Sequence, residues 1–191
     1  MTSNIEIKIF HNINPELEEI WKNNNNFNYI FQSLEYIKIH LNNKKTKPNV
    51  QKFFLLVMFN NQPYYILPLE TVSIFSCKIV RWIGNHEFDY CAPVVLEKAD
   101  KKITRENFLK IWDKLIKTLS KFDIIFLNNQ PELVGNFDNP FVKYLKNRFR
   151  SKNYYVSLNE NTDEFYNNLR NKHKNFDRFL RYKKKLIKNN N

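Results

Sequence analysis

The sequence predicts a mixed α/β or α+β domain, with helices flanking one central mixed sheet, followed by a basic C-terminal helix. Two observations lead to this prediction. Segments with the two-residue period of strands and segments with the 3.6-residue period of helices are mixed along the chain. The chain also has 191 residues, of which 42% are hydrophobic and 16% aromatic, so it is long and apolar enough to bury a core without metal or disulfides.

The first forty residues predict one strand and two helices. Residues 5–9 alternate isoleucine with charged residues, which is typical of a half-buried strand. Pro15 indicates a helix start, and residues 17–21 place Leu, Ile and Trp at helical spacing. Ser33 is of a residue type that caps helices, and it precedes an apolar stripe at residues 36–41. A helix is therefore expected after each of these two signals.

The middle of the chain predicts a hairpin and further strands. Apolar runs and β-branched residues alternate there with turn residues such as Asn, Gly and Pro. The expected elements are a buried strand Phe53–Phe59, a hairpin turn Asn60–Pro63, a return strand Tyr64–Leu69, a strand Lys78–Ile83 ending at Gly84, and a short strand Val94–Leu96.

The last third predicts helices and strands in alternation. Phe108, Ile111, Trp112, Leu115, Leu119 and Phe122 share one face of a long helix. The expected elements after it are a strand Asp123–Leu127, a short helix Phe141–Phe149, a strand Tyr154–Leu158, and a final helix Asp163–Lys188 that opens with Asn161 and Glu164 in a capping-box arrangement. We place the domain boundary at 160/161, with residues 161–191 as a basic linker helix.

Five motifs in this order resemble the GNAT superfamily, and more closely its FemAB-like and CelD-like acyltransferases. The resemblance rests on the helix opening Phe27–Tyr36, the strand Tyr65–Leu69, the segment Trp82–Val95 with its Gly84 and Asp89-Tyr90, the strand Asp123–Leu127 with Pro131, and the stretch from Tyr155 through Leu186. It covers most of the chain. It implies a GNAT-like N-terminal domain and transfer of an acyl or aminoacyl group to an amine acceptor, often in cell-envelope or polysaccharide chemistry.

The resemblance also implies where the acyl donor binds. In that family a second GNAT half carries the donor site, and this chain is expected to lack it, as a truncated or split enzyme that is inactive alone. GNAT donor sites hold the CoA pyrophosphate on the backbone N–H groups of a glycine-rich turn. The segment Val94–Asn107 contains no glycine. We therefore expect no cofactor on this chain, with acyl-CoA or aminoacyl-tRNA bound only by a separately encoded second half.

One polar cluster follows the strand that ends at Gly84, and it supplies the candidate acceptor-binding residues. They are Arg81, Asn85, His86, Asp89 and Tyr90. His86 with Asp89 could form a general base with an orienting carboxylate, or Asp89 and Tyr90 could simply bond the loop backbone while His86 is solvated. We add Arg170, Arg178 and Arg181, because guanidinium groups suit phosphate or carboxylate groups of a substrate.

Other histidines and cysteines have no predicted role. His11, His40 and His173 have no carboxylate or cysteine at ligand spacing, so they are expected to be ordinary side chains. Cys77 and Cys91 form neither a metal motif nor a disulfide framework, which favours a reducing cytoplasm. No run of residues is apolar enough for a signal peptide or a membrane span.

The net charge of +12 is concentrated at the C-terminus. Residues 165–191 hold nine basic residues and one acid, whereas the rest of the chain holds 22 basic and 18 acidic residues. Only seven of the 31 basic residues are arginine, and the abundance of Asn, Lys and Ile indicates a codon bias that raises the lysine content. This disfavours nucleic acid as the partner. The alternative functions left open are a module that binds RNA or a membrane surface with this tail, and a non-catalytic subunit of a two-chain acyltransferase.

Overall fold

A computed structural model describes residues 4–23, 30–43, 50–85, 87–96, 103–135, 137–145, 162–172 and 175–189. The chain forms two compact units, Met1–Arg148 and Phe149–Asn191. The boundary predicted at 160/161 stays a prediction.

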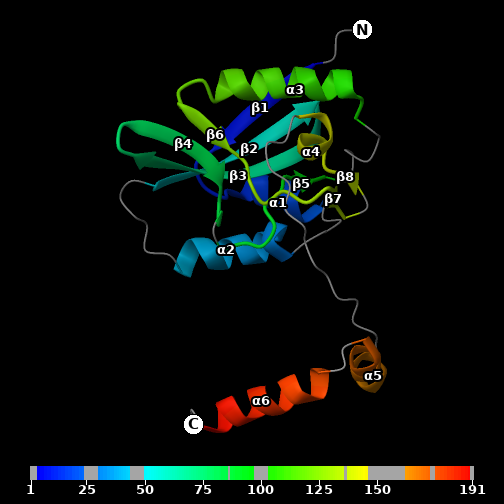
Figure 1. Ribbon diagram of the computed structural model, residues 1–191. Coiled ribbons are helices and arrows are strands. Elements are labelled where there is room, and N and C mark those ends of the chain that lie inside the picture. The colour runs from blue at the N-terminus through cyan, green and yellow to red at the C-terminus, as the bar shows by residue number, and fades with distance from the viewer. Residues whose placement is uncertain are drawn as a thin grey trace. The chain divides into compact units, whose positions relative to one another are not determined.

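The first unit contains the sheet and the helices that flank it (Figure 1). In chain order its elements are β1 Ile5–Phe10, α1 Pro15–Asn23, the 3-10 helix η1 Ile30–Gln32, α2 Leu34–Asn43, β2 Val50–Phe59, β3 Gln62–Ile74, β4 Cys77–Trp82, β5 Val94–Val95, α3 Arg105–Thr118, β6 Ile124–Phe126, β7 Leu133–Val134, β8 Phe137–Asp138 and α4 Pro140–Tyr144.

The described strands form a mixed sheet in the order β1-β2-β3-β4-β6. Neighbours from β1 to β4 are antiparallel, and the short β5 adds an antiparallel pairing to β3. The pair β4 and β6 is parallel, with Ile79, Val80 and Arg81 opposite Ile124, Ile125 and Phe126. Parallel neighbours need a crossover, and α3 lies in the connection between them. The predicted class, a mixed central sheet flanked by helices, is confirmed.

The β2–β3 hairpin is confirmed, but its turn is shorter than predicted. Asn60 and Asn61 have φ of 50° and 60°, the left-handed pair of a two-residue type I′ turn. Asparagine tolerates this conformation better than other residues with a side chain. Pro63, predicted in the turn, lies inside β3, where the register shifts between Val57 and Met58. A bulge of this kind is one of the few places where a strand accepts proline.

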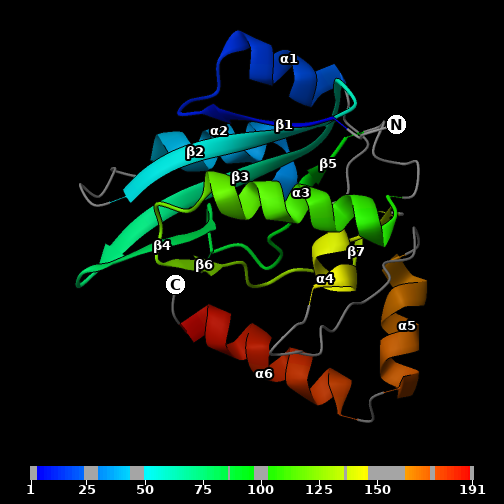
Figure 2. The same ribbon diagram turned by 90° about the horizontal axis from the view of Figure 1, so that it is seen from above.

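The hairpin is buried on both of its faces. The ring of Phe53 stacks with that of Phe122, just beyond α3, with 6.1 Å between centroids. The next residue, Phe54, points to the opposite face and meets Trp21 of α1 edge-on at 6.0 Å. Residues 53–57 of β2 and 65–71 of β3 are all buried. Figure 2 shows that α3 lies along one face of these strands, whereas α1 and α2 lie on the side of the opposite face.

Two helix caps confirm sequence signals. The Asn14 side chain accepts the Leu17 N–H at 2.9 Å, one residue before the proline that starts α1. The Ser33 hydroxyl accepts the Tyr36 N–H at 3.2 Å, as predicted for the start of α2. The indole N–H of Trp21 donates to the Gln32 carbonyl at 3.2 Å, which ties α1 to η1.

Two predicted helix ends are wrong, and one hairpin was not predicted. The helix α3 ends at Thr118, so Phe122 lies beyond it. The helix α4 ends at Tyr144, because Leu145 already has an extended backbone with ψ of 151°. The hairpin of β7 and β8 was not predicted, since strands of two residues are too short to show a period. Residues 146–149 of the predicted short helix, and the predicted strand Tyr154–Leu158, lie outside the described residues.

The second unit contains two helices, α5 Thr162–Lys172 and α6 Phe176–Asn189, which run in different directions (Figures 1 and 2). The prediction of one continuous helix is therefore wrong. Asn175 accepts the Phe179 N–H on its carbonyl at 3.0 Å, and Asp177 stands in the first turn of α6. An asparagine before a helix and an acid in its first turn both indicate a helix start. One continuous helix was predicted in spite of these signals, because apolar residues continue at helical spacing across the break. Asn161 lies outside the described residues.

We predict that Phe54→Ala lowers the free energy of unfolding by about 3–5 kcal/mol, because the side chain is 1% exposed and packs on Trp21. The matched control is Phe75→Ala in the β3–β4 turn, where the ring is 100% exposed and the change should stay within about 0.5 kcal/mol. Urea denaturation of both variants measures this. Equal losses in the two would contradict the assignment of the core.

Candidate functional site

The candidate site lies where β4 and β6 end, since open sheets bind ligands beyond the carboxyl ends of parallel strands. The loops that follow the two strands are joined directly. The Cys91 N–H donates to the Asn129 carbonyl at 2.9 Å, and the Asn129 side-chain amide donates to the Asn85 and Phe88 carbonyls at 3.0 and 3.4 Å. Asn129 has φ of 54°, so its backbone is held in the left-handed region at this junction.

A glycine turn shapes the loop after β4. Gly84 has φ of 77°, and its carbonyl accepts the N–H groups of Glu87 at 2.7 Å and Phe88 at 2.9 Å. A Cβ atom on Gly84 would come within 2.5 Å of the Phe88 ring. Only glycine therefore allows this turn to close on Phe88.

Phe88 anchors this loop to α2 and η1. Its ring is 4% exposed and stacks on Phe31 with 5.3 Å between centroids. It also meets Tyr36 and His40 of α2 edge-on, at 5.2 and 4.8 Å. Aromatic pairs at these separations and tilts are favourable beyond the area they bury. The loop position is thus set by packing.

A histidine and a carboxylate meet at the edge of this aromatic cluster. His40 Nδ1 lies 3.6 Å from Glu87 Oε2, and the His40 side chain is 9% exposed while that of Glu87 is 49% exposed. His40 was expected to be an ordinary side chain, because no carboxylate stands at ligand spacing from it in the sequence. His40 and Glu87 lie 47 positions apart, and packing on Phe88 brings them together.

His86 lies outside the described residues, so its predicted pairing with Asp89, and the alternative in which it is solvated, both stay predictions. Asp89 is exposed. Tyr90 is half-buried, and its carbonyl accepts the Gln32 side-chain amide at 3.1 Å. Asn85 is 2% exposed, and its carbonyl accepts the Asn129 side-chain amide at 3.0 Å. The backbone carbonyls of Tyr90 and Asn85 thus help to hold the loop in place.

Arg81 is engaged in the sheet. It lies opposite Glu70 in the β3–β4 register, and its Nε and an Nη donate to Glu70 Oε1 at 2.9 and 2.8 Å. Glu70 is 7% exposed, so the guanidinium supplies the charge and hydrogen bonds that its burial requires. Arg81 therefore serves a buried ion pair, and its use for an acceptor stays a prediction.

The three predicted arginines of the tail belong to the second unit. Arg170 donates to Asp177 at 3.0 Å and to the Asn167 side chain at 3.1 Å. Arg181 donates from Nε to the Asp177 carbonyl at 3.3 Å, and Arg178 is exposed. Their predicted contact with a substrate stays a prediction.

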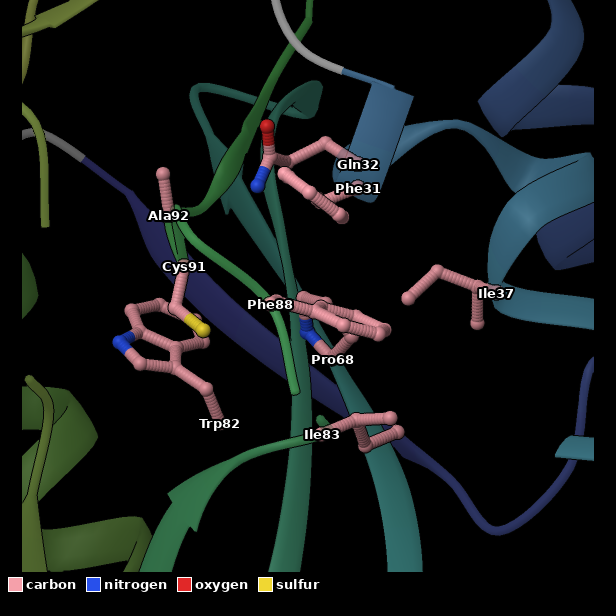
Figure 3. A pocket seen from close by; sticks show the side chains of 9 residues that line it. All are labelled: Phe31, Gln32, Ile37, Pro68, Trp82, Ile83, Phe88, Cys91 and Ala92. Carbon is pink, nitrogen blue, oxygen red and sulfur yellow. The ribbon is translucent and has the colours of Figure 1, made fainter. Parts of the chain in front are cut away.

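A small cavity lies beside the loop, with room for about one water molecule. Figure 3 shows Phe88 amid its lining, near Pro68, with Cys91 next to the Trp82 indole. Burial raises the pKa of the Cys91 thiol to about 12, and Glu70 acts in the same direction. A thiol with such a pKa stays protonated near pH 7, so Cys91 is not suited to be a nucleophile.

Two absences hold for the described ranges. Within them, no three His, Cys, Asp or Glu side chains gather into a metal site. No helix in the same part of the chain is long and apolar enough to cross a membrane.

Sequence reasoning missed His40 and Phe88 as parts of the site, whereas Glu87 belongs to the polar cluster that the sequence indicates after β4. The signal for the turn was present, because Gly84 stands directly after a strand and Phe88 is the next large apolar residue. The partnership with α2 left no local signal, since it joins segments that are distant in sequence.

Comparisons with known proteins give the following. The sequence matches no family model and no curated protein. Among solved structures, it is similar to an aminoglycoside acetyltransferase from an uncultured soil metagenomic sample in complex with sisomicin, with 14% identity and a TM-score of 0.42 over 81% of this chain and 97% of that one. The corresponding complex with trehalose gives 12% identity and a TM-score of 0.40, with the same coverage. We derive no activity from similarities of this size.

We predict that Gly84→Ala lowers the free energy of unfolding by about 2–4 kcal/mol, since it adds a clash with Phe88 to the strain of a positive φ. In a Phe88→Ala background the same change should cost only about 1 kcal/mol, because the strain alone remains. A double-mutant cycle by urea denaturation measures the coupling. Additive effects would show that the Phe88 ring does not occupy the space beside Gly84.

Proposed function

We propose that the first unit is the acceptor-side half of an N-acyltransferase of the GNAT type, of the FemAB-like or CelD-like kind. The observation that carries the proposal is the order of the described sheet. Antiparallel neighbours from β1 to β4 lead to a parallel pair, β4 and β6, joined through α3. This order fits the fold implied by the five sequence motifs, and the joined loops lie at the end of the sheet where such a site is expected.

The chemistry of acyl transfer to an amine suits the residues at this end. An amine is mostly protonated near pH 7, so it must lose a proton before its nitrogen can attack a carbonyl carbon. In the proposed reaction His40 takes that proton and Glu87 stabilises the imidazolium that forms. The exposed carboxylates of Glu87 and Asp89 also favour a cationic acceptor, such as an amino group of a glycan or peptide.

The acyl donor is assigned to a second acyltransferase domain, on the same or another polypeptide. The segment 94–107 contains no glycine, the residue on which the phosphate-binding turns of GNAT donor sites rely. At the start of α3, the Thr104 hydroxyl already accepts the Asn107 N–H at 3.3 Å. That N–H is one of the groups that a helix-bound phosphate would otherwise use.

The donor assignment predicts that the full chain shows no saturable binding of acetyl-CoA by calorimetry, up to millimolar concentrations. The assignment would be contradicted if acetyl-CoA bound with a dissociation constant in the low micromolar range and substitutions within residues 94–107 abolished this binding. That result would place a donor site on this chain and leave the acceptor assignment open to its own test.

The acceptor assignment predicts that the chain binds a polyamine or an amino sugar weakly, and that Glu87→Gln reduces this affinity about five- to tenfold. The reason is the loss of one exposed negative charge beside His40. The matched control is Glu106→Gln, an exposed carboxylate at the start of α3, which should change nothing. Calorimetry at low salt measures both variants, and equal effects would refute a site at Glu87.

A further inference from the structure

Positive charge is concentrated on one helix of the second unit. The 14 residues of α6 include Arg178, Arg181, Lys183, Lys184, Lys185 and Lys188, with Asp177 as the acid. By contrast, α5 carries two acids in its first turn and two basic residues in its last. Of the chain's net charge of +12, α6 therefore carries +5 within 14 residues, whereas the charges of α5 balance.

The acid of α6 is already neutralised within the unit. Asp177 Oδ1 accepts a hydrogen bond from Arg170 Nε at 3.0 Å, which ties the start of α6 to α5. This carboxylate thus offsets a charge of α5. Asp177 is thus the acidic residue that α6 sets against its six basic residues.

Two aromatic side chains of α6 stand exposed. Phe179 is 54% exposed and Tyr182 is 61% exposed. A phenylalanine ring that stays in water lacks the favourable free energy of burial. Tyrosine has an apolar ring and a polar hydroxyl group, so it suits the boundary between water and an apolar phase.

The order of residue types separates apolar from basic positions around α6. At 100° per residue, positions 176, 179, 180, 186 and 187 fall on one side of the helix, all of them Phe, Leu or Ile. Positions 178, 181, 184, 185 and 188 fall on the other side and are all Arg or Lys. Position 182, a tyrosine, lies at the border. Lys183 falls on the apolar side, where a long aliphatic stem is tolerated.

From these observations we propose that α6 binds the surface of an anionic lipid bilayer. A helix with a strongly basic side, an apolar side with Phe and Leu, and low mean hydropathy lies in the plane of the interface. With 14 residues α6 is about 21 Å long, shorter than the hydrocarbon core of about 30 Å, so it lies on the membrane. Its basic residues attract acidic headgroups, and Phe179 enters the boundary with the acyl chains.

RNA would attract the same basic residues, and its bases could stack on Phe179 and Tyr182. It gives no role, however, to the aliphatic positions 180, 186 and 187 on the apolar side. A bilayer uses both sides of α6 at once, which is why the separation of residue types favours it.

The test is co-sedimentation of the full chain with vesicles of phosphatidylcholine alone, or with a quarter of phosphatidylserine. Binding is expected to the anionic vesicles and to fall more than about tenfold on the neutral ones. Arg178→Gln with Arg181→Gln should weaken binding to anionic vesicles about 30-fold. The control Lys114→Gln with Lys117→Gln removes the same charge from exposed positions of α3 and should leave binding unchanged.

A second pair of variants separates the membrane from RNA. Phe179→Ser with Tyr182→Ser keeps every charge of α6, and it should reduce vesicle binding more than about tenfold. A labelled mixed-sequence RNA of about 20 nucleotides is titrated in parallel. The proposal is overturned if neither vesicle type binds, or if the α3 and α6 charge variants lose binding equally. It is also overturned if the chain binds the RNA but not the vesicles, with Phe179→Ser/Tyr182→Ser leaving that affinity intact.

Discussion

The burial of the β2–β3 hairpin on both faces is the constraint on which the first unit depends. Adjacent residues of a strand point to opposite faces, so Phe53 and Phe54 need separate layers to cover them. The layer with α3 covers one face and the layer with α1 and α2 covers the other. Leaving out either layer would expose a row of large apolar side chains, which is why a sheet of this composition requires helices on both sides.

The candidate site follows from that arrangement. Because α2 is held against the sheet, its Tyr36 and His40 face the loop after β4, and Phe88 packs on both rings. Because Gly84 has no side chain, the Phe88 ring can pack against the turn. The Asn129 side chain, which follows β6, donates to the Asn85 carbonyl and so ties the two loops together. A polar pair, His40 and Glu87, is thus held in place mainly by apolar contacts.

The two units divide the chemistry of the chain. The first unit has 20 basic and 15 acidic residues, an ion pair buried in its sheet and a loop with exposed carboxylates. The second is shorter and more strongly basic, with 11 basic and 4 acidic residues, and it has exposed aromatic residues. If the first unit holds an amine acceptor and α6 lies on an anionic surface, the acceptor is expected at or near a membrane. Envelope glycans and peptides with free amines have that location, and both proposals can be tested separately.

Sequence alone determined the elements and the class of the fold, because strand and helix periods, caps and turn residues are local signals. The Ser33 cap, the Asn60-Asn61 turn and the buried run of β2 are examples. Only tertiary structure decided which distant side chains meet. Arg81 pairs with Glu70 through the hairpin register, and His40 reaches Glu87 because Phe88 packs on α2. Spacing along the chain could suggest only neighbours such as His86 and Asp89, because local proximity is all that a sequence offers when the contacts that assemble a site span dozens of residues.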